Sequence, residues 1–333
     1  MRTHGPCVPT EMIDVSVIVP VYNAGSLVSR CLDSIFNQAG GFSIEVILVD
    51  DGCTDNSVEV INARPEQDRI RLFRQSNSGP AKARNRGIAE ARGSYLAFID
   101  ADDYWLPDFL INTVRFLNDH DECVAVSVAQ RHLTTSGEHE APKDWSVLAP
   151  EEGCVLEDFY DFWAKHNHVC TGSILIRSKV AKSTGGQRED LRICEDLEFW
   201  ALLAAAGSIG YIPKMLFVSD GSKVTADIGW VAKHLPRWNA AVPVDIWQRR
   251  IVRHNPEVLD NPGFINARGR IARNLTYSIL MSKRYALAKT QIRIYGETFP
   301  KDKMTTLMRA GASNPLMWLI VSRALVYREY HRK

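Results

Sequence analysis

Residues 95–103 read Tyr-Leu-Ala-Phe-Ile-Asp-Ala-Asp-Asp, and this stretch carries the strongest signal in the chain. The apolar run at 95–99 has the length and composition of a buried strand. It ends abruptly in three carboxylates within four positions. Such carboxylates repel one another unless a cation or hydrogen-bond donors lie between them, and hard cations such as Mg²⁺ take oxygen ligands of this kind. Taken alone, the stretch is also compatible with a solvated acidic turn.

Two earlier apolar runs end in a similar way. Residues 15–23, Val-Ser-Val-Ile-Val-Pro-Val-Tyr-Asn, predict a central strand that ends at Pro20, because proline cannot donate to a strand ladder. Residues 45–51, Glu-Val-Ile-Leu-Val-Asp-Asp, predict a second buried strand. Apolar residues at helical spacing follow at 27–36, and Pro80 favours a helix over 81–91.

Alternating strands and helices predict an α/β fold with a mostly parallel central sheet flanked by helices. In such sheets ligands bind beyond the carboxyl ends of the strands. Three predicted strand ends, at residues 20–23, 50–51 and 100–103, should therefore meet at one crevice. This convergence favours a site over a simple acidic turn.

Composition and charge indicate the cellular compartment and the kind of partner. The chain has 333 residues, is 45% hydrophobic, and has seven scattered cysteines without a Cys-x-x-Cys pair. An odd, scattered set indicates reduced thiols and a cytoplasmic protein, and residues 1–10 contain no apolar segment typical of a secretory signal. Residues 221–333 hold 20 Lys and Arg against 7 Asp and Glu. This basic half predicts contact with an anionic surface at the inner face of a membrane, or simply a soluble surface.

Four blocks of sequence, in order, resemble family 2 glycosyltransferases of the GT-A fold. They are Val15–Asn23, then Val-Asp-Asp-Gly-Cys-Thr-Asp at 49–55, Asn-Ser-Gly-Pro-Ala-Lys-Ala-Arg-Asn-Arg-Gly at 77–87, and Phe-Ile-Asp-Ala-Asp-Asp at 98–103. The resemblance covers roughly residues 14–220, with Cys53 where the family usually has serine. It implies a tail at 1–13, a GT-A nucleotide-binding domain at 14–225, and a basic, mainly helical C-terminal appendage at 226–333.

The resemblance also implies roles for the crevice. Asp102 would hold Mg²⁺ or Mn²⁺ against the diphosphate of a sugar nucleotide, and Asp100 would touch the ribose or share the ion, through a metal-bound water. Asp50 would accept a hydrogen bond from the base, and Arg84 would reach the base or the phosphates. The remaining nucleotide contacts would come from the strand ends and the glycine turn, namely Pro20, Val21, Tyr22, Asn23, Gly79 and Ala101.

A second motif, Ile-Cys-Glu-Asp-Leu-Glu-Phe-Trp at 193–200, resembles the acidic pair of this family. Asp196 would be the general base for the acceptor hydroxyl, and Glu195 would orient it or touch the acceptor. Direct attack opposite the leaving diphosphate, with UDP the favoured nucleotide, inverts the anomeric centre. Acceptor contacts are expected from Trp238 and His168, and a lid at 219–225 with Lys223 is a further candidate. A saccharide or lipid-linked saccharide acceptor would suit cell-surface polysaccharide synthesis.

Other interpretations stay open at this point. A nucleotidyltransferase also places acids and a metal beside a nucleotide, but it needs a glycine-rich phosphate loop with a lysine, which residues 20–23 lack. A silent sugar-nucleotide-binding module is a third possibility, and nucleic-acid binding has no recognisable module to support it. Residues 314–333 predict a helix that either lies in a membrane interface or packs on the appendage.

Overall fold

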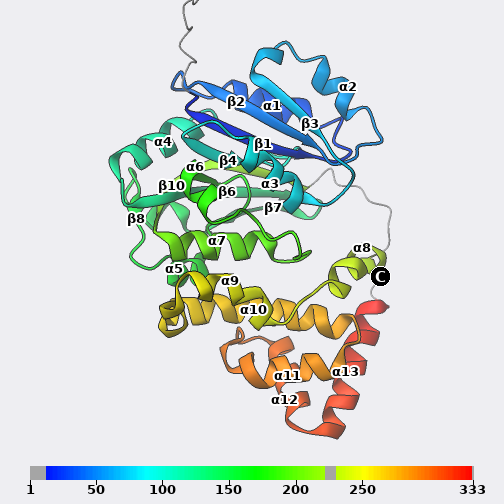
Figure 1. The fold of residues 1–333 in the computed structure, drawn as a ribbon. Coiled ribbons are helices and arrows are strands. Elements are labelled where there is room, and N and C mark those ends of the chain that lie inside the picture. The colour runs from blue at the N-terminus through cyan, green and yellow to red at the C-terminus, as the bar shows by residue number, and fades with distance from the viewer. Residues whose placement is uncertain (1–12, 222–229, 332–333) are drawn as a thin grey trace, which may run out of the picture.

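A computed structural model describes residues 13–221 and 230–331 (Figure 1). Its sheet has the strand order β3-β2-β1-β4-β9-β6-β10-β5. The first four of these are parallel neighbours: β3 (Ile70–Arg74), β2 (Ile44–Asp50), β1 (Val15–Val21) and β4 (Tyr95–Phe98). The carboxyl ends of β2, β1 and β4 therefore lie side by side, as the sequence predicts.

The other half of the sheet is mixed. β9 (Ile174–Arg177) runs antiparallel to both β4 and β6 (Cys123–Thr134), whereas β6 and β10 (Ser208–Asp220) are parallel. Three short strands pair at the margins, β5 (Tyr104–Trp105) and β8 (Cys154–Val155) with β10, and β7 (Gly137–Ala141) with β6.

The first strand continues one residue beyond its predicted end. Pro20 pairs with Val49 and Val21 with Asp50. Ile18 accepts a hydrogen bond from the Ile99 amide on the β4 side, and Pro20 faces the same side because strand residues alternate. Pairing with β4 ends at Ile18, so the N–H that proline lacks has no partner to lose.

Alternation along the strands divides the core between the two faces of the sheet. Odd-numbered residues of β1, such as Val17 and Val19, pack with α1 (Val28–Phe36) and α4 (Phe109–Asp119). Even-numbered Ile18 belongs instead to the cluster that contains α3 (Pro80–Glu90) and α7 (Glu195–Ala206). Three further helices complete this region, α2 (Ser57–Asn62), α5 (Phe159–His166) and α6 (Ser178–Ser183).

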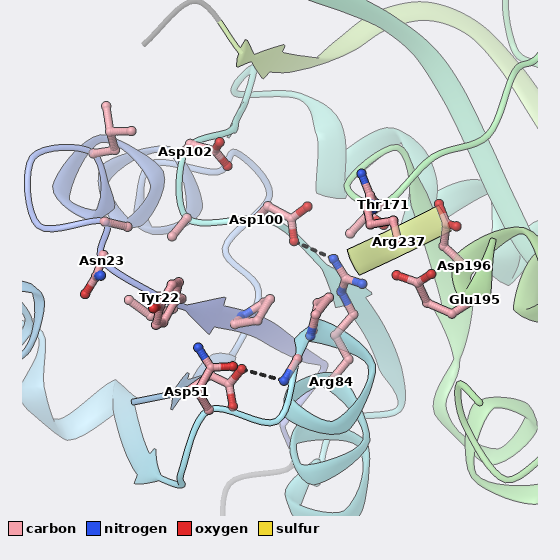
Figure 2. A pocket seen from close by; sticks show the side chains of 18 of the residues that line it. Tyr22, Asn23, Asp51, Arg84, Asp100, Asp102, Thr171, Glu195, Asp196 and Arg237 are labelled. Carbon is pink, nitrogen blue, oxygen red and sulfur yellow. Dashed lines mark hydrogen bonds and ion pairs between the residues drawn. The ribbon is translucent and has the colours of Figure 1, made fainter. Parts of the chain in front are cut away.

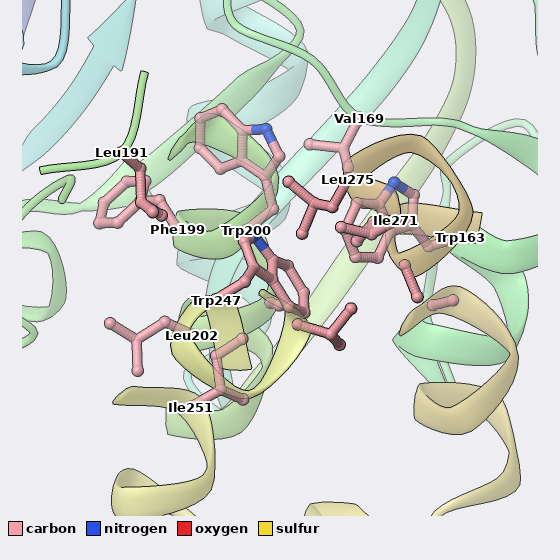
Figure 3. Packing of buried hydrophobic residues seen from close by; sticks show 14 of the residues in the cluster. Trp163, Val169, Leu191, Phe199, Trp200, Leu202, Trp247, Ile251, Ile271 and Leu275 are labelled. Atoms are coloured by element: carbon pink, nitrogen blue, oxygen red, sulfur yellow. The ribbon is translucent and has the colours of Figure 1, made fainter. Parts of the chain in front are cut away.

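The apolar cluster on the side of the sheet covered by α3 and α7 extends beyond α7. It continues from Trp200 and Leu202 of α7 to Trp247 and Ile251 of α9 (Figure 3). The C-terminal helices, stacked below α7 in Figure 1, are α8 (Trp230–Asn239), α9 (Val244–His254), α10 (Pro262–Met281), α11 (Tyr285–Tyr295), α12 (Lys303–Ser313) and α13 (Pro315–Tyr330). They share one buried core with the sheet.

Candidate active site

A cleft of about 940 Å³ lies at the carboxyl ends of the parallel strands (Figure 2). This volume is within the range that small-molecule and cofactor sites occupy. Its walls come from β1, the α3 turn, the β4 end, the start of α7 and α8. The lining residues are Pro20, Val21, Tyr22, Asn23, Ala24, Ser26, Leu27, Asp51, Asn77, Gly79, Pro80, Arg84, Asp100, Ala101, Asp102, Thr171, Cys194, Glu195, Asp196 and Arg237.

The end of β1 forms one wall. Tyr22 is 55% exposed and presents its ring to the cleft, although aromatic rings of this size are mostly buried. Asn23 has a left-handed backbone (φ 52°), and its Oδ1 accepts a hydrogen bond from the Thr54 amide at 2.8 Å. The strand end is thereby tied to the turn after β2, which leaves the Tyr22 ring free to contact a planar ligand.

Of the two acids after β2, Asp51 lines the cleft and Asp50 does not. Asp50 turns back into its own loop, where Oδ1 accepts from the Gly52 amide (3.1 Å) and the Cys53 amide (2.8 Å). Asp51 accepts from the Ser78 and Gly79 amides at 2.9 and 2.8 Å, and so fixes the turn before α3. Asp51 is therefore the acid that a ligand in the cleft could reach from this turn, whereas Asp50, which was expected to meet the nucleotide base, lies outside the cleft lining.

Carboxylates gather at the end of β4. Asp102 lines the cleft, and burial together with neighbouring Asp100 raises its pKa. Asp103 does not line the cleft, and its Oδ1 accepts a hydrogen bond from the Asp220 amide at 2.8 Å. Burial, then Asp100 and Asp102, raise the pKa of Asp103 to about 8. This cluster has an excess of negative charge that a cation would relieve.

One cation of the protein, Arg30, already binds beside this cluster of carboxylates. Arg30 of α1 binds Asp220 through Nη1 and the Asp102 carbonyl through Nη2, both at 2.6 Å. It thereby joins the end of β10 to the turn after β4 and leaves the Asp102 carboxylate to the cleft. This role could not be predicted from the sequence, because Arg30 is one charged residue among several in an amphipathic helix.

The donor set fits a hard divalent ion that is shared with a ligand. Within residues 13–221 and 230–331, no three His, Cys, Asp or Glu side chains converge to hold an ion unaided. Mg²⁺ is commonly bound by one or two carboxylates together with substrate phosphates. Asp102 and Asp100, which both line the cleft, offer that arrangement.

Arg84 occupies the centre of the cleft. It is almost fully buried, and its Nη2 binds Asp100 Oδ1 at 2.6 Å. The carboxylates of Asp196 and Glu195, on the facing wall, also raise the pKa of Arg84, whereas burial opposes them. Figure 2 shows its guanidinium between Asp100 and this acidic pair. Arg84 therefore separates two acidic centres by a fixed positive charge.

The acidic pair opens α7. Cys194 precedes it in a left-handed conformation (φ 60°), and its carbonyl accepts from Trp247 Nε1 at 3.1 Å. Burial raises the pKa of Asp196, and Arg84 opposes that effect. Burial and Asp196 raise the pKa of Glu195. Two carboxylates with raised pKa values at the mouth of a cleft suit proton transfer.

Two further lining residues were not singled out from the sequence. Arg237 of α8 reaches the cleft beside Asp196 and Thr171 (Figure 2). The only signal for Arg237 was its place in His234-Leu-Pro-Arg-Trp238, which resembles the Gln-x-x-Arg-Trp motif of processive family members. Thr171 offers no signal beyond its position before β9.

The expected acceptor residues fall in different places. Trp238 borders a second hollow of about 350 Å³, which shares Cys194, Asp196 and Arg237 with the main cleft, but its own side chain is only 4% exposed and packs against His234 and Tyr330. His168 is fully buried among Phe159, Phe162 and Tyr211, and burial lowers its pKa to about 3. It is a core residue, so its expected role in the acceptor site is corrected.

Two further expectations concern the chain outside the cleft. The candidate lid at 219–225 with Lys223 lies mostly outside the described residues. A search of the described helices finds none with the length and apolar character needed to cross a bilayer.

The sequence profile named Glycosyl transferase family 2 matches residues 16–184, just over half of the chain. The chain belongs to this family. The cleft residues from the ends of β1, β2 and β4 and from the α3 turn fall inside the match, whereas the Glu195–Asp196 pair and the C-terminal helices lie beyond it.

Bacterial relatives agree with this assignment. The uncharacterized glycosyltransferase YibD of Escherichia coli is 39% identical over 125 residues, which are 37% of this chain and 36% of the relative. Glycosyltransferase GlyG of Streptococcus pneumoniae is 46% identical over 114 residues, 34% of this chain and 38% of the relative. In both pairs the similarity spans well under half of the relative's length.

Solved structures show the same fold over nearly the whole chain. TarS 1-349 of S. aureus in complex with UDP-GlcNAc has a TM-score of 0.63 at 16% identity, covering 96% of this chain and 89% of that one. The mannosyltransferase PcManGT of Pyrobaculum calidifontis, in complex with GDP-Man and Mn2+, has a TM-score of 0.54 at 20% identity, covering 98% and 89%. At these identities the likeness establishes the GT-A fold, including the presence of C-terminal helices.

Proposed function

We propose that this glycosyltransferase moves a sugar from a nucleoside diphosphate, with UDP favoured, to a hydroxyl of a saccharide acceptor, and inverts the anomeric centre. The observation that carries the proposal is the division of the cleft. Asp100 and Asp102 lie on one wall, Glu195 and Asp196 on the facing wall, and Arg84 between them (Figure 2). A reaction with a departing diphosphate on one side and an attacking hydroxyl on the other needs this division.

The donor would occupy the side formed by β1 and β4. Tyr22 and Asn23 would contact the nucleoside, and Asp51 would replace Asp50 as the acid that faces it. Mg²⁺ or Mn²⁺ held by Asp102 and Asp100 would supply Lewis acidity to the leaving diphosphate. Arg84 adds fixed positive charge on the path between donor and acceptor. Two neighbours bind UDP-GlcNAc, or GDP-Man with Mn2+, which supports a nucleotide-sugar donor here.

Asp196 would take the proton from the acceptor hydroxyl. Its position at the first turn of α7 suits a base, because burial raises its pKa while nearby Arg84 favours the ionised form. Glu195 would orient the acceptor. Direct attack from the Asp196 side requires no second nucleophile; it would displace the diphosphate in one step and invert the configuration.

The acceptor would enter through the hollow beside Trp238. This hollow joins the main cleft at Asp196, and it is lined by rings and hydrogen-bonding groups of the kind that bind sugars, including Trp238, His234, Asn274, Tyr277 and Ser278. A saccharide, free or linked to a lipid, would present its hydroxyl to Asp196 from there. Cell-surface polysaccharide synthesis in the cytoplasm is the setting that we propose.

A panel of sugar nucleotides tests the donor assignment. Thermal unfolding with each compound and Mn²⁺ should show a higher Tm only for the true donor class, because a ligand that binds the native state stabilises it. Release of free nucleoside diphosphate should follow for the same compounds and cease on chelation. Release of pyrophosphate from a nucleoside triphosphate and a sugar phosphate would instead support a nucleotidyltransferase and overturn the proposal. If the protein bound a sugar nucleotide but transferred its sugar to none of the acceptors supplied, that result would support a catalytically silent binding module.

A further inference from the structure

Over its first turns the helix α13 is apolar on its outer face as well as its inner one, whereas Arg323 and Arg328 are exposed on its later turns. Its inner face, with Trp318, Ser322 and Leu325, is buried against the other C-terminal helices. On the opposite side, Leu316 is 66% exposed and Ile320 57%. A helix that is apolar all round is normally covered on every side. No described residue covers this outer face.

The exposed apolar residues gather at one end of the molecule. Leu316, Met317, Leu319 and Ile320 occupy the first turns of α13, and Leu307 is exposed in the middle of the preceding helix α12. We call these five residues the apolar tip. In Figure 1 the corner between α12 and α13 is at the end of the C-terminal helices opposite the sheet. Scattered surface leucines are ordinary, but a projecting cluster of this kind marks a contact site.

A basic hollow borders the apolar tip. It measures about 390 Å³, and its charged residues are Lys289 and Arg293 of α11, Arg309 of α12, and Glu297. Arg309 pairs with Glu297, whereas Lys289 and Arg293 form no ion pair with any described residue. Pro315 lines the hollow and precedes Leu316 of the tip, so the two features are contiguous.

We propose that this end of the molecule docks on an anionic lipid bilayer, with the apolar tip inserted at the interface and lipid phosphates in the basic hollow. Apolar side chains flanked by Lys and Arg are the combination that places a helix on, and not across, a membrane. The +13 charge of residues 221–333 adds long-range attraction to such a surface. The inference goes beyond the proposed transfer reaction, although a bilayer would also present a lipid-linked acceptor.

A second copy of this chain suits the surface less well. A symmetric contact through the apolar tip would bring the basic hollows of both copies together, and two such hollows repel. An anionic bilayer satisfies the apolar and the basic parts at once, so the charge pattern distinguishes the two partners.

Sedimentation with lipid vesicles tests the proposal in the absence of nucleotide. The protein should bind vesicles of phosphatidylcholine mixed with phosphatidylglycerol, bind phosphatidylcholine alone weakly, and dissociate as salt rises. The double variant L316D/I320D should lose at least tenfold in vesicle affinity. K289A/R293A should lose about 25-fold, since each cation near an anionic surface contributes about fivefold.

Matched controls are available on the sheet half of the molecule. Val147 is exposed and apolar, and Arg115 is an exposed cation on α4. V147D and R115A should bind vesicles as the unchanged protein does. Because none of these positions lines the cleft or the hollow beside Trp238, donor hydrolysis without vesicles should be equal in every variant, so a failed transfer reaction and a failed docking proposal give different results.

Two outcomes would overturn the proposal. Equal vesicle binding by L316D/I320D and V147D would place the membrane contact elsewhere. Self-association of the unchanged protein in sedimentation velocity, abolished by L316D/I320D with no vesicle binding in either, would identify the apolar tip as a contact between copies.

Discussion

Replacing Trp247 of α9 tests whether the C-terminal helices and the sheet fold as one unit. The Trp247 side chain is fully buried beside Trp200 and Leu202 of α7, and its Nε1 donates to the Cys194 carbonyl (Figure 3). Truncating a buried tryptophan to alanine costs about 3–5 kcal/mol of unfolding free energy, and the lost hydrogen bond adds about 1 kcal/mol. Against a typical total of about 5–15 kcal/mol, W247A should be severely destabilised.

The assay is urea unfolding followed by both fluorescence and far-ultraviolet circular dichroism. One shared core predicts a single transition by both probes, shifted to much lower urea in W247A. W247F is the matched control, because it keeps an apolar ring while it removes the donor to Cys194 and part of the indole volume. It should lose about 1–2 kcal/mol of unfolding free energy, mainly the hydrogen bond and a little volume.

Two separate transitions would refute this reasoning, most clearly if W247A moved only one of them. The division of the chain near residue 225 would then be a real boundary between independently folding domains. Transfer activity in W247F gives a second reading, because loosening the Cys194 carbonyl should lower the transfer rate without changing donor binding.

Further predictions concern the cleft. D102N should abolish Mn²⁺-dependent binding of the nucleoside diphosphate in calorimetry, and binding equal to that of the unchanged protein would exclude Asp102 as a metal ligand. D196N should keep donor binding but lower transfer by about 10²–10⁴-fold, the usual share of a general base; normal turnover would end the base assignment. The Asp196 carboxylate must be ionised to act as a base, and burial raises its pKa, so kcat/KM should fall as pH drops through that raised pKa. In R84Q this fall in kcat/KM should occur at higher pH, because Arg84 is the cation that lowers the pKa of Asp196. R250M should cost about 3–5 kcal/mol of unfolding free energy by leaving Glu198 buried and unpaired, and R250M/E198L should recover most of it.

Local pattern was enough to place the elements at one side of the cleft. Apolar runs of strand length correctly predicted β1, β2 and β4, and the helical spacing at 27–36 and the proline at 80 correctly predicted α1 and α3. They also predicted that the strand ends meet. The antiparallel insertion of β9 could not be predicted in this way, because strand direction depends on connections far apart in sequence.

Which side chain faces the cleft was less predictable. Asp50 and Asp51 are adjacent acids of the same type, and only the hydrogen bonds of Asp50 to the Gly52 and Cys53 amides decide between them. Histidine is a residue type that is common in functional sites, yet aromatic side chains from α5 and β10 enclose His168. Arg237 reaches the cleft from the appendage, which local sequence cannot place against α7.

The helix α7 has two tasks along its length. Its first turn presents the acidic pair to the cleft, and its later turns form the apolar surface on which α9 packs. Different C-terminal helices could therefore be exchanged during evolution without change to the proposed donor site, provided that each replacement covered the apolar surface that Trp247 now covers. Acceptor choice could then diversify separately from donor choice, which would give one ancestral catalyst many different glycan products.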